Sequence, residues 1–469
     1  MNLDETYDQA LELYNKGRFE DSIKICNKIV DIDQNHPHTW NLLGNIFFKQ
    51  NDLDSAKNFF ITAINQKEDF VEAYYMLGNT LFTANFFHEA IGIWQEGLKH
   101  EQVAIIYSNI AAAFIKLEDT NNALLNAQKA LEIDDRCEDA YNCILSIAKK
   151  QNDLETIENF SKILLMLNPE NAIANTDYAY TLLKKGDFKN GFKHFEYRKK
   201  LDTQKGKYAY MPFQEYKNEN LEDKNLLIYH EQGFGDNIQF ARFLKDIPCK
   251  NISYGIQNSL NKLFSYNFPN IKFLKEISST DSFDYSIASM SIPYSFNINK
   301  IDAKSYLTVD KKDIENFKEK NILKGFKNIG IVWKGSQTSE FANKKSLELN
   351  NFELLFNYEN RKFHSLQIDN KEDLVNYNNI SDLGKEFKSF YDTAVAISSL
   401  DLVISVDTAV AHLCGALGKK GIVLNNNMQF DFRWEQINQK SIWYESLTIL
   451  KYDDINKCIN QLNRLIDEL

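Results

Sequence analysis

A repeat unit of about 34 residues recurs through the first two hundred positions of this chain. Residues 37–70 align with residues 71–103, so that Gly44 falls opposite Gly78 and aromatic residues recur in matching slots. Each unit has the length and apolar spacing of two short helices joined by a turn. Because one such hairpin buries too little apolar surface to be stable alone, we expect the hairpins to stack in order along the chain. Further units begin near Leu3, Ala104, Glu138 and Ala172.

Small residues at one slot of the repeat indicate how its helices pack. Glycine or alanine there lets the two helices of a hairpin approach closely, while large aromatic residues fill the gap to the next hairpin. Period and residue class together are typical of the tetratricopeptide repeat. The sequence therefore predicts an α-solenoid of about six repeats over residues 1–201, with a concave groove. The small-residue slot contains Gly44, Gly78, Ala111 and Ala179.

Asparagines fall at helix positions that usually face such a groove. An amide side chain both donates and accepts hydrogen bonds, so it can bind the backbone of an extended peptide. The structural alternative is that asparagine simply occupies these slots, since the chain uses it freely everywhere. The candidate groove residues are Asn41, Asn45, Asn79 and Asn142.

A second architecture follows a stretch without clear periodicity, residues 202–222, which we interpret as a linker. Beyond it, short apolar runs alternate with amphipathic stretches, and the run DLVISV (401–406) is continuous enough for a strand buried on both faces. Such alternation predicts parallel sheets flanked by helices. The pattern restarts near residue 325, so we expect two Rossmann-like α/β domains, at 223–324 and 325–469.

The turn EQGFGD (231–236) follows the first of these strands, where open parallel sheets bind ligands. It lacks the lysine of a P-loop and the third glycine of a dinucleotide fingerprint. Gly233 and Gly235 would bring the backbone close to a ligand, because a side chain at either position would clash or forbid the turn, while Asp236 points a carboxylate at the ligand. The structural alternative is a tight turn in which Asp236 is only the N-cap of a helix that opens at Asn237.

A second turn, VDTAVAH (406–412), follows DLVISV at the equivalent edge of the second sheet. A helix N-terminus there, with its unpaired N–H groups and positive dipole end, would bind phosphate. Thr408 would add a hydroxyl, and His412 would reach a ribose or phosphate. The structural alternatives are helix capping by Asp407 or Thr408, and a buried core histidine at 412. Cations expected at neighbouring strand exits are Lys344, Lys345 and Arg433.

The composition excludes several classes of function. A net charge of −11 gives no general attraction for nucleic acid or anionic membranes, and we interpret the basic run at 198–200 as a solvated face. No run of about 20 apolar residues is present, and the first residues lack the pattern of a signal peptide, so we expect a cytoplasmic protein. The six cysteines form no C-x-x-C pair and the histidines are scattered, so neither a disulfide framework nor a metal site is expected.

Several segments carry a resemblance to a known family: EQGFGDNIQFARFL, GIVWKGSQ, FHSLQ, SLDLVISVDTAVAHLCGALG and RWEQINQKSIWY. They resemble the C-terminal region of bacterial tetratricopeptide-repeat glycosyltransferases. That region is similar to the ADP-heptose:lipopolysaccharide heptosyltransferases, which have the two-domain GT-B fold. The segment FKNGFKHFEYRKKL resembles the last repeat of those fused proteins, so the similarity extends over most of the chain.

The resemblance implies a nucleotide-sugar donor on the second α/β domain, an acceptor on the first, and an inverting transfer that needs no metal and no other cofactor. The D-x-D at 31–33 lies at a repeat boundary, which agrees with a cationic side chain in place of a metal ion. The strand GIVLNNN departs from its relatives at Asn425, which leaves the acceptor open. By motif match, the resemblance places Asp236 as the proposed catalytic base, Lys345 at the diphosphate, and the nucleotide-binding turn at Asp407, Thr408, Ala409 and His412.

Three hypotheses about function remain open at this point. The first is a glycosyltransferase whose acceptor, a protein, is recruited by the repeats. The second is a non-catalytic tetratricopeptide scaffold with a degenerate sugar- or nucleotide-binding module. The third is an enzyme similar to O-GlcNAc transferase, which shares the plan of repeats followed by a GT-B region. The presence of Asp236, Asp407 and His412 favours the first over the second, and the motifs match the heptosyltransferase set better than the third.

Overall fold

The computed structural model describes residues 2–201, 211–278, 281–335, 345–368, 371–426, 431–437 and 440–468. Internal packing divides the chain into two compact units, Met1–Pro169 and Glu170–Leu469. The division differs from the expected one after residue 201, because the last helical hairpin packs with the α/β region. Each unit is described by itself.

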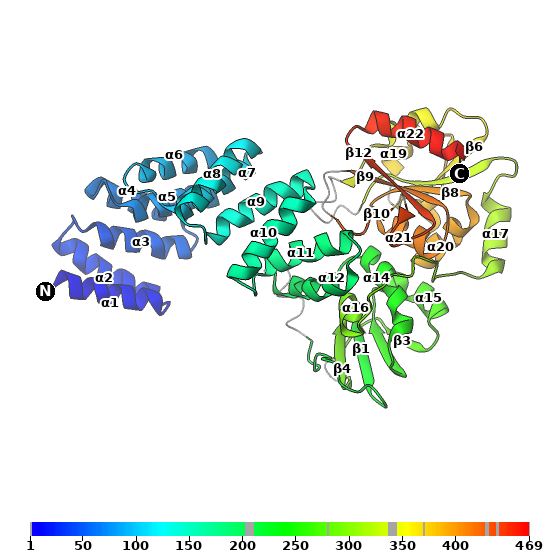
Figure 1. The fold of residues 1–469 in the computed structure, drawn as a ribbon, viewed down its shortest axis with the longest axis horizontal. Coiled ribbons are helices and arrows are strands. Elements are labelled where there is room, and N and C mark those ends of the chain that lie inside the picture. The colour runs from blue at the N-terminus through cyan, green and yellow to red at the C-terminus, as the bar shows by residue number, and fades with distance from the viewer. Residues whose placement is uncertain are drawn as a thin grey trace. The chain divides into compact units, whose positions relative to one another are not determined.

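The first unit is a run of antiparallel helical hairpins, coloured blue to cyan-green in Figure 1. Successive odd- and even-numbered helices pair, α1 with α2, α3 with α4, and so on. The predicted α-solenoid is therefore confirmed for this part of the chain. Its helices within the described residues are α1 (Leu3–Asn15), α2 (Phe19–Ile32), α3 (Pro37–Lys49), α4 (Leu53–Gln66), α5 (Val71–Thr83), α6 (Phe87–Leu98), α7 (Ala104–Lys116), α8 (Thr120–Ile133), α9 (Glu138–Gln151) and α10 (Leu154–Leu167).

The glycines of the small-residue slot sit where two helices nearly touch. A Cβ atom added to Gly44 would lie 2.5 Å from the ring of Phe60, and one added to Gly78 would lie 2.1 Å from Nε1 of Trp94. Both aromatic rings are buried. The close approach predicted from the repeat is confirmed at these two positions.

The turn inside each hairpin places one residue in the left-handed region of the backbone map. This conformation ends a helix without strain when the residue is glycine or, at low cost, asparagine. The left-handed residue recurs every 33 or 34 positions, in step with the sequence repeat. The set is Gly17, Asn51, Asn85, Glu118, Asn152 and Gly186.

The second unit begins with a sixth hairpin, α11 (Ala172–Lys184) and α12 (Phe188–Phe195), followed by the 3-10 helix η1 (Glu196–Lys200). The apolar face of this hairpin packs against residues of the α/β region. Phe192 and Phe195, each 1% exposed, belong to the same buried cluster as Phe240, Trp443 and other residues of the α/β region. The sixth hairpin is thus part of the core of the second unit.

Two parallel sheets follow the hairpin. The first has the order β3-β2-β1-β4 and contains β1 (Asn225–Tyr229), β2 (Asn251–Gly255), β3 (Ile271–Leu274) and β4 (Tyr285–Ala288). The second has the order β12-β9-β8-β5-β6-β7 and contains β5 (Lys327–Val332), β6 (Arg361–Ser365), β7 (Ile380–Asp382), β8 (Leu402–Val406), β9 (Gly421–Asn426) and β12 (Leu447–Tyr452). A short antiparallel ribbon, β10 (Gln436–Ile437) and β11 (Lys440–Ser441), lies between β9 and β12 in the chain.

Helices cover both faces of the larger sheet, as Figure 1 shows for α22 on one side and α20 and α21 on the other. When the strands of this sheet are numbered by their order in the chain, their order across the sheet is 3-2-1-4-5-6. The smaller sheet has the order 3-2-1-4, the first four positions of the same pattern. This is the strand order of a doubly wound Rossmann sheet. The helices and 3-10 turns are α14 (Phe234–Phe240), η2 (Ala241–Asp246), α15 (Asn258–Asn267), η3 (Ser289–Ser291), α16 (Ile292–Ser295), α17 (Lys311–Asn321), η4 (Leu349–Leu355), α19 (Lys371–Leu374), η5 (Gly384–Glu386), α20 (Phe390–Ser399), α21 (Ala409–Ala416) and α22 (Ile455–Glu468).

Two segments pack differently from the expected domain plan. Residues 202–210 of the expected linker lie outside the described residues, but 211–222 run along the edge of the first sheet. There Tyr216 donates its backbone N–H to the carbonyl of Ser286 at 2.9 Å and stacks on Phe296. Helix α17 falls in the range expected for the first α/β domain, yet it packs on α20 of the second.

Candidate functional site

Two strand exits meet where the two α/β domains touch. The turn after β1 leads into α14, and the turn after β8 leads into α21. These helices pack so closely that a Cβ atom added to Gly235 would lie 2.7 Å from Cδ2 of His412. Each exit flanks the point where the strand order of its sheet reverses, which is where open α/β sheets bind ligands. The site is therefore built from the ligand-binding edges of both sheets.

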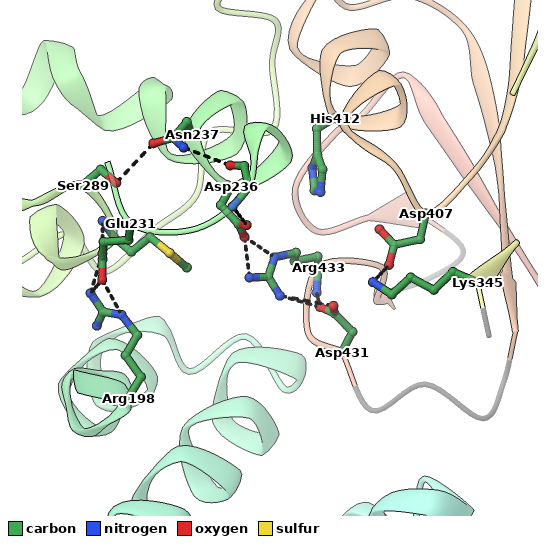
Figure 2. Close-up of polar contacts among 12 residues, drawn as sticks. Arg198, Glu231, Asp236, Asn237, Ser289, Lys345, Asp407, His412, Asp431 and Arg433 are labelled. Carbon is green, nitrogen blue, oxygen red and sulfur yellow. Dashed lines mark hydrogen bonds and ion pairs between the residues drawn. The ribbon is translucent and has the colours of Figure 1, made fainter. Parts of the chain in front are cut away.

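Asp236 lies in this contact, at the third residue of α14. The N-cap interpretation is wrong in position, because α14 begins at Phe234 and Gly233 is its N-cap. Oδ2 of Asp236 accepts the backbone N–H of Gly233 at 3.1 Å, which closes the first turn. Oδ1 accepts from Nε and Nη2 of Arg433 at 3.1 and 2.6 Å, as Figure 2 shows.

Arg433 is shared between two aspartates from different parts of the chain. Its Nη1 donates to both carboxylate oxygens of Asp431 at 3.1 Å, on the side away from Asp236. Burial alone would raise the pKa of the Asp431 carboxyl, but the positive charges of Arg433 and Lys345 outweigh burial and lower it to about 2. Sequence reasoning missed Asp431, although it stands two residues before the predicted cation in the segment FDFRW.

Lys345 forms an ion pair with Asp407 at the exit of β8. Burial would lower the pKa of Lys345, but the negative charges of Asp407 and Asp431 outweigh it and raise that pKa. Of the three cations expected here, Lys345 and Arg433 are brought together with Asp236, while Lys344 lies outside the described residues. Both described cations are ion-paired, so an anionic ligand would share them with aspartates.

The N-terminus of α21 keeps the features of an anion-binding site. Thr408 is its N-cap residue, as the capping alternative expected, but neither Thr408 nor Asp407 makes a side-chain capping bond to the start of α21. The hydroxyl of Thr408 pairs with Ser405 Oγ at 2.9 Å instead. Among the described residues no hydrogen bond takes up the N–H groups of Ala409 and Val410. Such groups at a helix start are available to a phosphate oxygen.

His412 lies one turn into α21 and is 3% exposed. Its Nδ1 is 2.9 Å from the hydroxyl of Tyr444, and its ring packs on Trp434 with centroids 4.4 Å apart. Burial, followed by the positive charge of Arg433, lowers the pKa of His412 to about 3, so the ring is neutral at pH 7. His412 is therefore packed as a buried core histidine, as the structural alternative predicted. Because Nδ1 faces Tyr444, a neutral hydrogen bond from His412 to a ligand would use Nε2.

Replacing His412 with asparagine is expected to change how stability depends on pH. The folded chain binds no proton at His412 between about pH 6.5 and about pH 3, whereas the unfolded chain does, so this residue costs stability as pH falls through that window. From about pH 7.5 to about pH 5 the unaltered chain should lose on the order of 2 kcal/mol more unfolding free energy than His412→Asn. Urea unfolding at the two pH values measures this difference. Equal losses in the two chains would show that His412 is protonated in the folded state.

The two glycines of the first turn differ in what they make possible. Gly235 allows the contact of α14 with His412, and the clash expected there is confirmed. Gly233 has an extended backbone, φ −71° and ψ 176°, and an added Cβ would meet only Oδ2 of Asp236 at 3.7 Å. The expectation that a side chain at 233 would clash or forbid the turn is therefore wrong.

Buried side chains anchor the first turn, and sequence reasoning did not identify them. Asn237 is 1% exposed and donates to the carbonyl of Gly233 at 2.9 Å, while Tyr254 donates to its Oδ1 at 2.8 Å. Glu231 pairs with Arg198 of η1 at 2.7 Å. Arg198 is 2% exposed, so the interpretation of residues 198–200 as a solvated face is wrong for this residue.

The candidate groove residues all belong to the first unit. Asn41 is 3% exposed and donates to Glu72 of the next repeat at 2.9 Å. Asn79 accepts from Asn109 of the following repeat at 2.8 Å. Asn45 and Asn142 are half-buried. Asn41 and Asn79 thus connect neighbouring repeats, a structural role that the sequence did not predict.

No cluster of three or more metal-ligating side chains occurs among the residues that the structure describes. In the same residues no helix combines the length and the apolar character that a membrane span requires.

Comparison with known proteins supports the repeat architecture. Residues 37–70 match the tetratricopeptide repeat family. A segment of 65 residues, 14% of this chain, is 38% identical to human tetratricopeptide repeat protein 12, of which it covers 9%. The N-terminal region of the chain is therefore built of tetratricopeptide repeats.

Longer similarity is found at lower identity. The chain is 22% identical to protein FlbA of Caulobacter vibrioides over 474 residues, covering 92% of this chain and 78% of that protein. Among solved structures, the tetratricopeptide protein YrrB matches 38% of this chain and 92% of its own at 17% identity, with a TM-score of 0.31. PilF of Pseudomonas aeruginosa matches 45% of this chain and 97% of its own at 12% identity, with a TM-score of 0.40.

Proposed function

We propose that the chain is a glycosyltransferase of the GT-B type that moves a sugar from a nucleotide-sugar donor to an acceptor recruited by its repeats. One observation carries this proposal. A carboxylate from the first α/β domain, Asp236, pairs with Arg433 of the second, beside the open start of α21 and the ion pair of Lys345 with Asp407, at the edges where Rossmann-type sheets bind ligands. The sequence resemblance to heptosyltransferase-like enzymes agrees with this arrangement.

The proposed reaction assigns one task to each side of the site. Asp236 takes the proton of the acceptor hydroxyl as its oxygen attacks the anomeric carbon. The bond from that carbon to the diphosphate breaks on the opposite face, and the diphosphate leaves with the electron pair. Lys345, Arg433 and the N–H groups that open α21 stabilise the negative charge that develops there. No step requires a metal ion.

The repeats supply the acceptor in this proposal. Tetratricopeptide solenoids bind proteins and peptides on their concave face, and a protein acceptor is the class that such a surface would recruit. Asn45 and Asn142 are half-buried on the first helices of their hairpins and are the groove residues whose role as peptide ligands we retain.

A second candidate function is a scaffold whose α/β half binds a nucleotide without catalysis. The ion pairs of Lys345 and Arg433 favour it, because a site whose cations already hold aspartates is stable without a phosphate ligand. The two functions differ in turnover and not in nucleotide binding, so a binding experiment tests the site that both share.

Nucleoside diphosphates are expected to bind this chain in the presence of EDTA. Calorimetry with UDP, GDP and ADP measures the affinity, and Lys345→Met should weaken it by roughly tenfold or more because a charge-assisted contact to phosphate is lost. Lys320→Met is the matched control, since Lys320 pairs with Glu386 on the exposed surface of the same unit. Binding that disappears with EDTA and returns with magnesium or manganese would refute a metal-independent site.

A further inference from the structure

The sixth hairpin and the 3-10 helix after it make one ion pair to each α/β domain, and the cation of each pair is buried. Arg198, in η1, pairs with Glu231 of the first domain, and Lys184, at the end of α11, pairs with Glu435 of the second. The side chains of Arg198 and Glu231 are 3% and 1% exposed, and that of Lys184 is 1% exposed. No other helix before residue 200 belongs to this unit.

Two of the three side-chain nitrogens of Arg198 bond the first domain, while Nη1 donates to the carbonyl of Phe195 and to Glu196 at 3.0 and 2.8 Å on its own side of the contact. Nε and Nη2 of Arg198 donate to Glu231 over 2.7 to 3.2 Å, and Nη2 also donates to Ser291 Oγ at 2.9 Å. Glu231 in turn accepts the backbone N–H of Met290 at 2.8 Å. This network joins the hairpin to the turns after β1 and β4, which flank the strand-order reversal of the first sheet.

The contact with the second domain combines charge with aromatic packing. Nζ of Lys184 lies 3.0 Å from Glu435, which also pairs with Lys451 of β12 at 2.9 Å. Tyr180, one turn earlier in α11, packs edge-on against Phe432 with ring centroids 5.0 Å apart. The hairpin therefore contacts the segment 431–435 at two residues, Phe432 and Glu435.

The two segments that the hairpin and η1 contact, 231–236 and 431–435, contain the residues that meet in the site. Glu231 opens the turn that ends at Asp236, and Glu435 lies two residues after Arg433. Asp236 and Arg433 are in turn 2.6 Å apart. A change in either hairpin contact would therefore move one partner relative to the other.

We propose that the sixth hairpin is a brace for the active site, in which Arg198 positions Asp236 and Lys184 positions Arg433. This inference rests on the proposed function, because it assigns the brace to the residues that we place in catalysis and donor binding. Neither Arg198 nor Lys184 is assigned a contact with substrate. They act through Glu231 and Glu435, and the geometry they set decides how Asp236 faces the acceptor.

The test uses the full chain with Arg198→Lys and Lys184→Met. Lysine at 198 keeps the charge but cannot make the paired bonds to Glu231 together with the bond to Ser291. Methionine at 184 keeps most of the packing volume, and Glu435 retains Lys451 as a partner. Arg361→Lys is the matched control, because Arg361 is a buried arginine that pairs with Asp467 and bonds Asn463 on α22, remote from the site.

Hydrogen exchange provides a readout that does not depend on activity. Arg198→Lys should speed exchange of amides in 231–240, and Lys184→Met that of amides in 431–435, each by roughly tenfold or more, while Arg361→Lys leaves both segments unchanged. In steady-state transfer, Arg198→Lys should lower kcat on the order of 10-fold to 100-fold with the donor KM within about threefold, since a misplaced base affects the chemical step. Lys184→Met should raise the donor KM.

The outcomes separate the brace from the proposed function. If both site variants match Arg361→Lys in exchange and in kinetics, the brace is refuted. If faster exchange in 231–240 accompanies unchanged kcat, Arg198 is a structural residue only and the positioning role is refuted. If the unaltered chain transfers no sugar, the proposed function fails, and exchange alone then decides whether the hairpin holds the two segments.

Discussion

Asp236→Asn is expected to lower sugar transfer on the order of 10²-fold or more while the chain still folds and binds nucleoside diphosphate. Asparagine matches aspartate in size, and its oxygen can still accept from Arg433, but it cannot take a proton from an acceptor. The lost bond from Gly233 and the lost charge opposite Arg433 should cost about 1–2 kcal/mol of stability. Melting temperature, diphosphate affinity and turnover are measured on the same preparation.

Asp431→Asn provides the matched control for this substitution. It removes the other carboxylate from the same guanidinium, yet it leaves the turn and the base in place. A catalytic base predicts that Asp236→Asn loses far more turnover than Asp431→Asn at similar stability. If both variants melt lower and both transfer sugar at the parental rate, Asp236 serves the fold through its ion pair and its helix turn, and the assignment of the base is wrong.

A chain that begins at residue 170 is expected to fold and to bind nucleoside diphosphate, whereas one that begins at residue 203 is not. The shorter fragment lacks Phe192 and Phe195, both 1% exposed, and it lacks Arg198 and Lys184, which pair with Glu231 and Glu435. Losing these apolar contacts alone removes on the order of 5 kcal/mol, which approaches the whole stability of a typical domain. Circular dichroism melting and calorimetry measure both properties.

The fragment 170–469 also tests what the repeats contribute. It should retain diphosphate affinity close to that of the full chain but lose transfer to a native protein acceptor, because it lacks the first unit. Transfer at the full rate would refute recruitment by the repeats. A cooperative melt of the fragment 203–469 would instead show that the sixth hairpin is dispensable, and that the expected boundary near residue 201 was correct.

Local patterns in the sequence were enough to predict the main architecture. The repeat period and its small residues, such as Gly44 and Gly78, report contacts between neighbouring hairpins, which lie close in the chain. The apolar runs that become β1, β5 and β8 are buried on both faces, so their composition identifies them as parallel strands. Each of these inferences depends on residues within one hairpin or one strand.

The remaining features depend on residues far apart in the chain. Asp236 and Arg433 are separated by 197 positions, and no pattern near either one reports the other. Arg198 stands in a run of basic residues, where only its distant partner Glu231 distinguishes a buried side chain from a solvated one. The last hairpin keeps the repeat pattern, so its sequence does not show that its apolar face is buried against α/β residues.

The left-handed turn residue that recurs through the hairpins has a consequence for how such chains can change length. Its period continues from Asn152 to Gly186, although these two residues belong to different compact units. The six hairpins are therefore equivalent in backbone geometry. In packing they differ, because five belong to the first unit and the sixth belongs to the second. Whole hairpins can accordingly be gained or lost before Pro169 without removing any residue of the site or of the unit that contains it. A chain built on this plan can vary the number of its repeats while the α/β unit, with its own hairpin, stays the same.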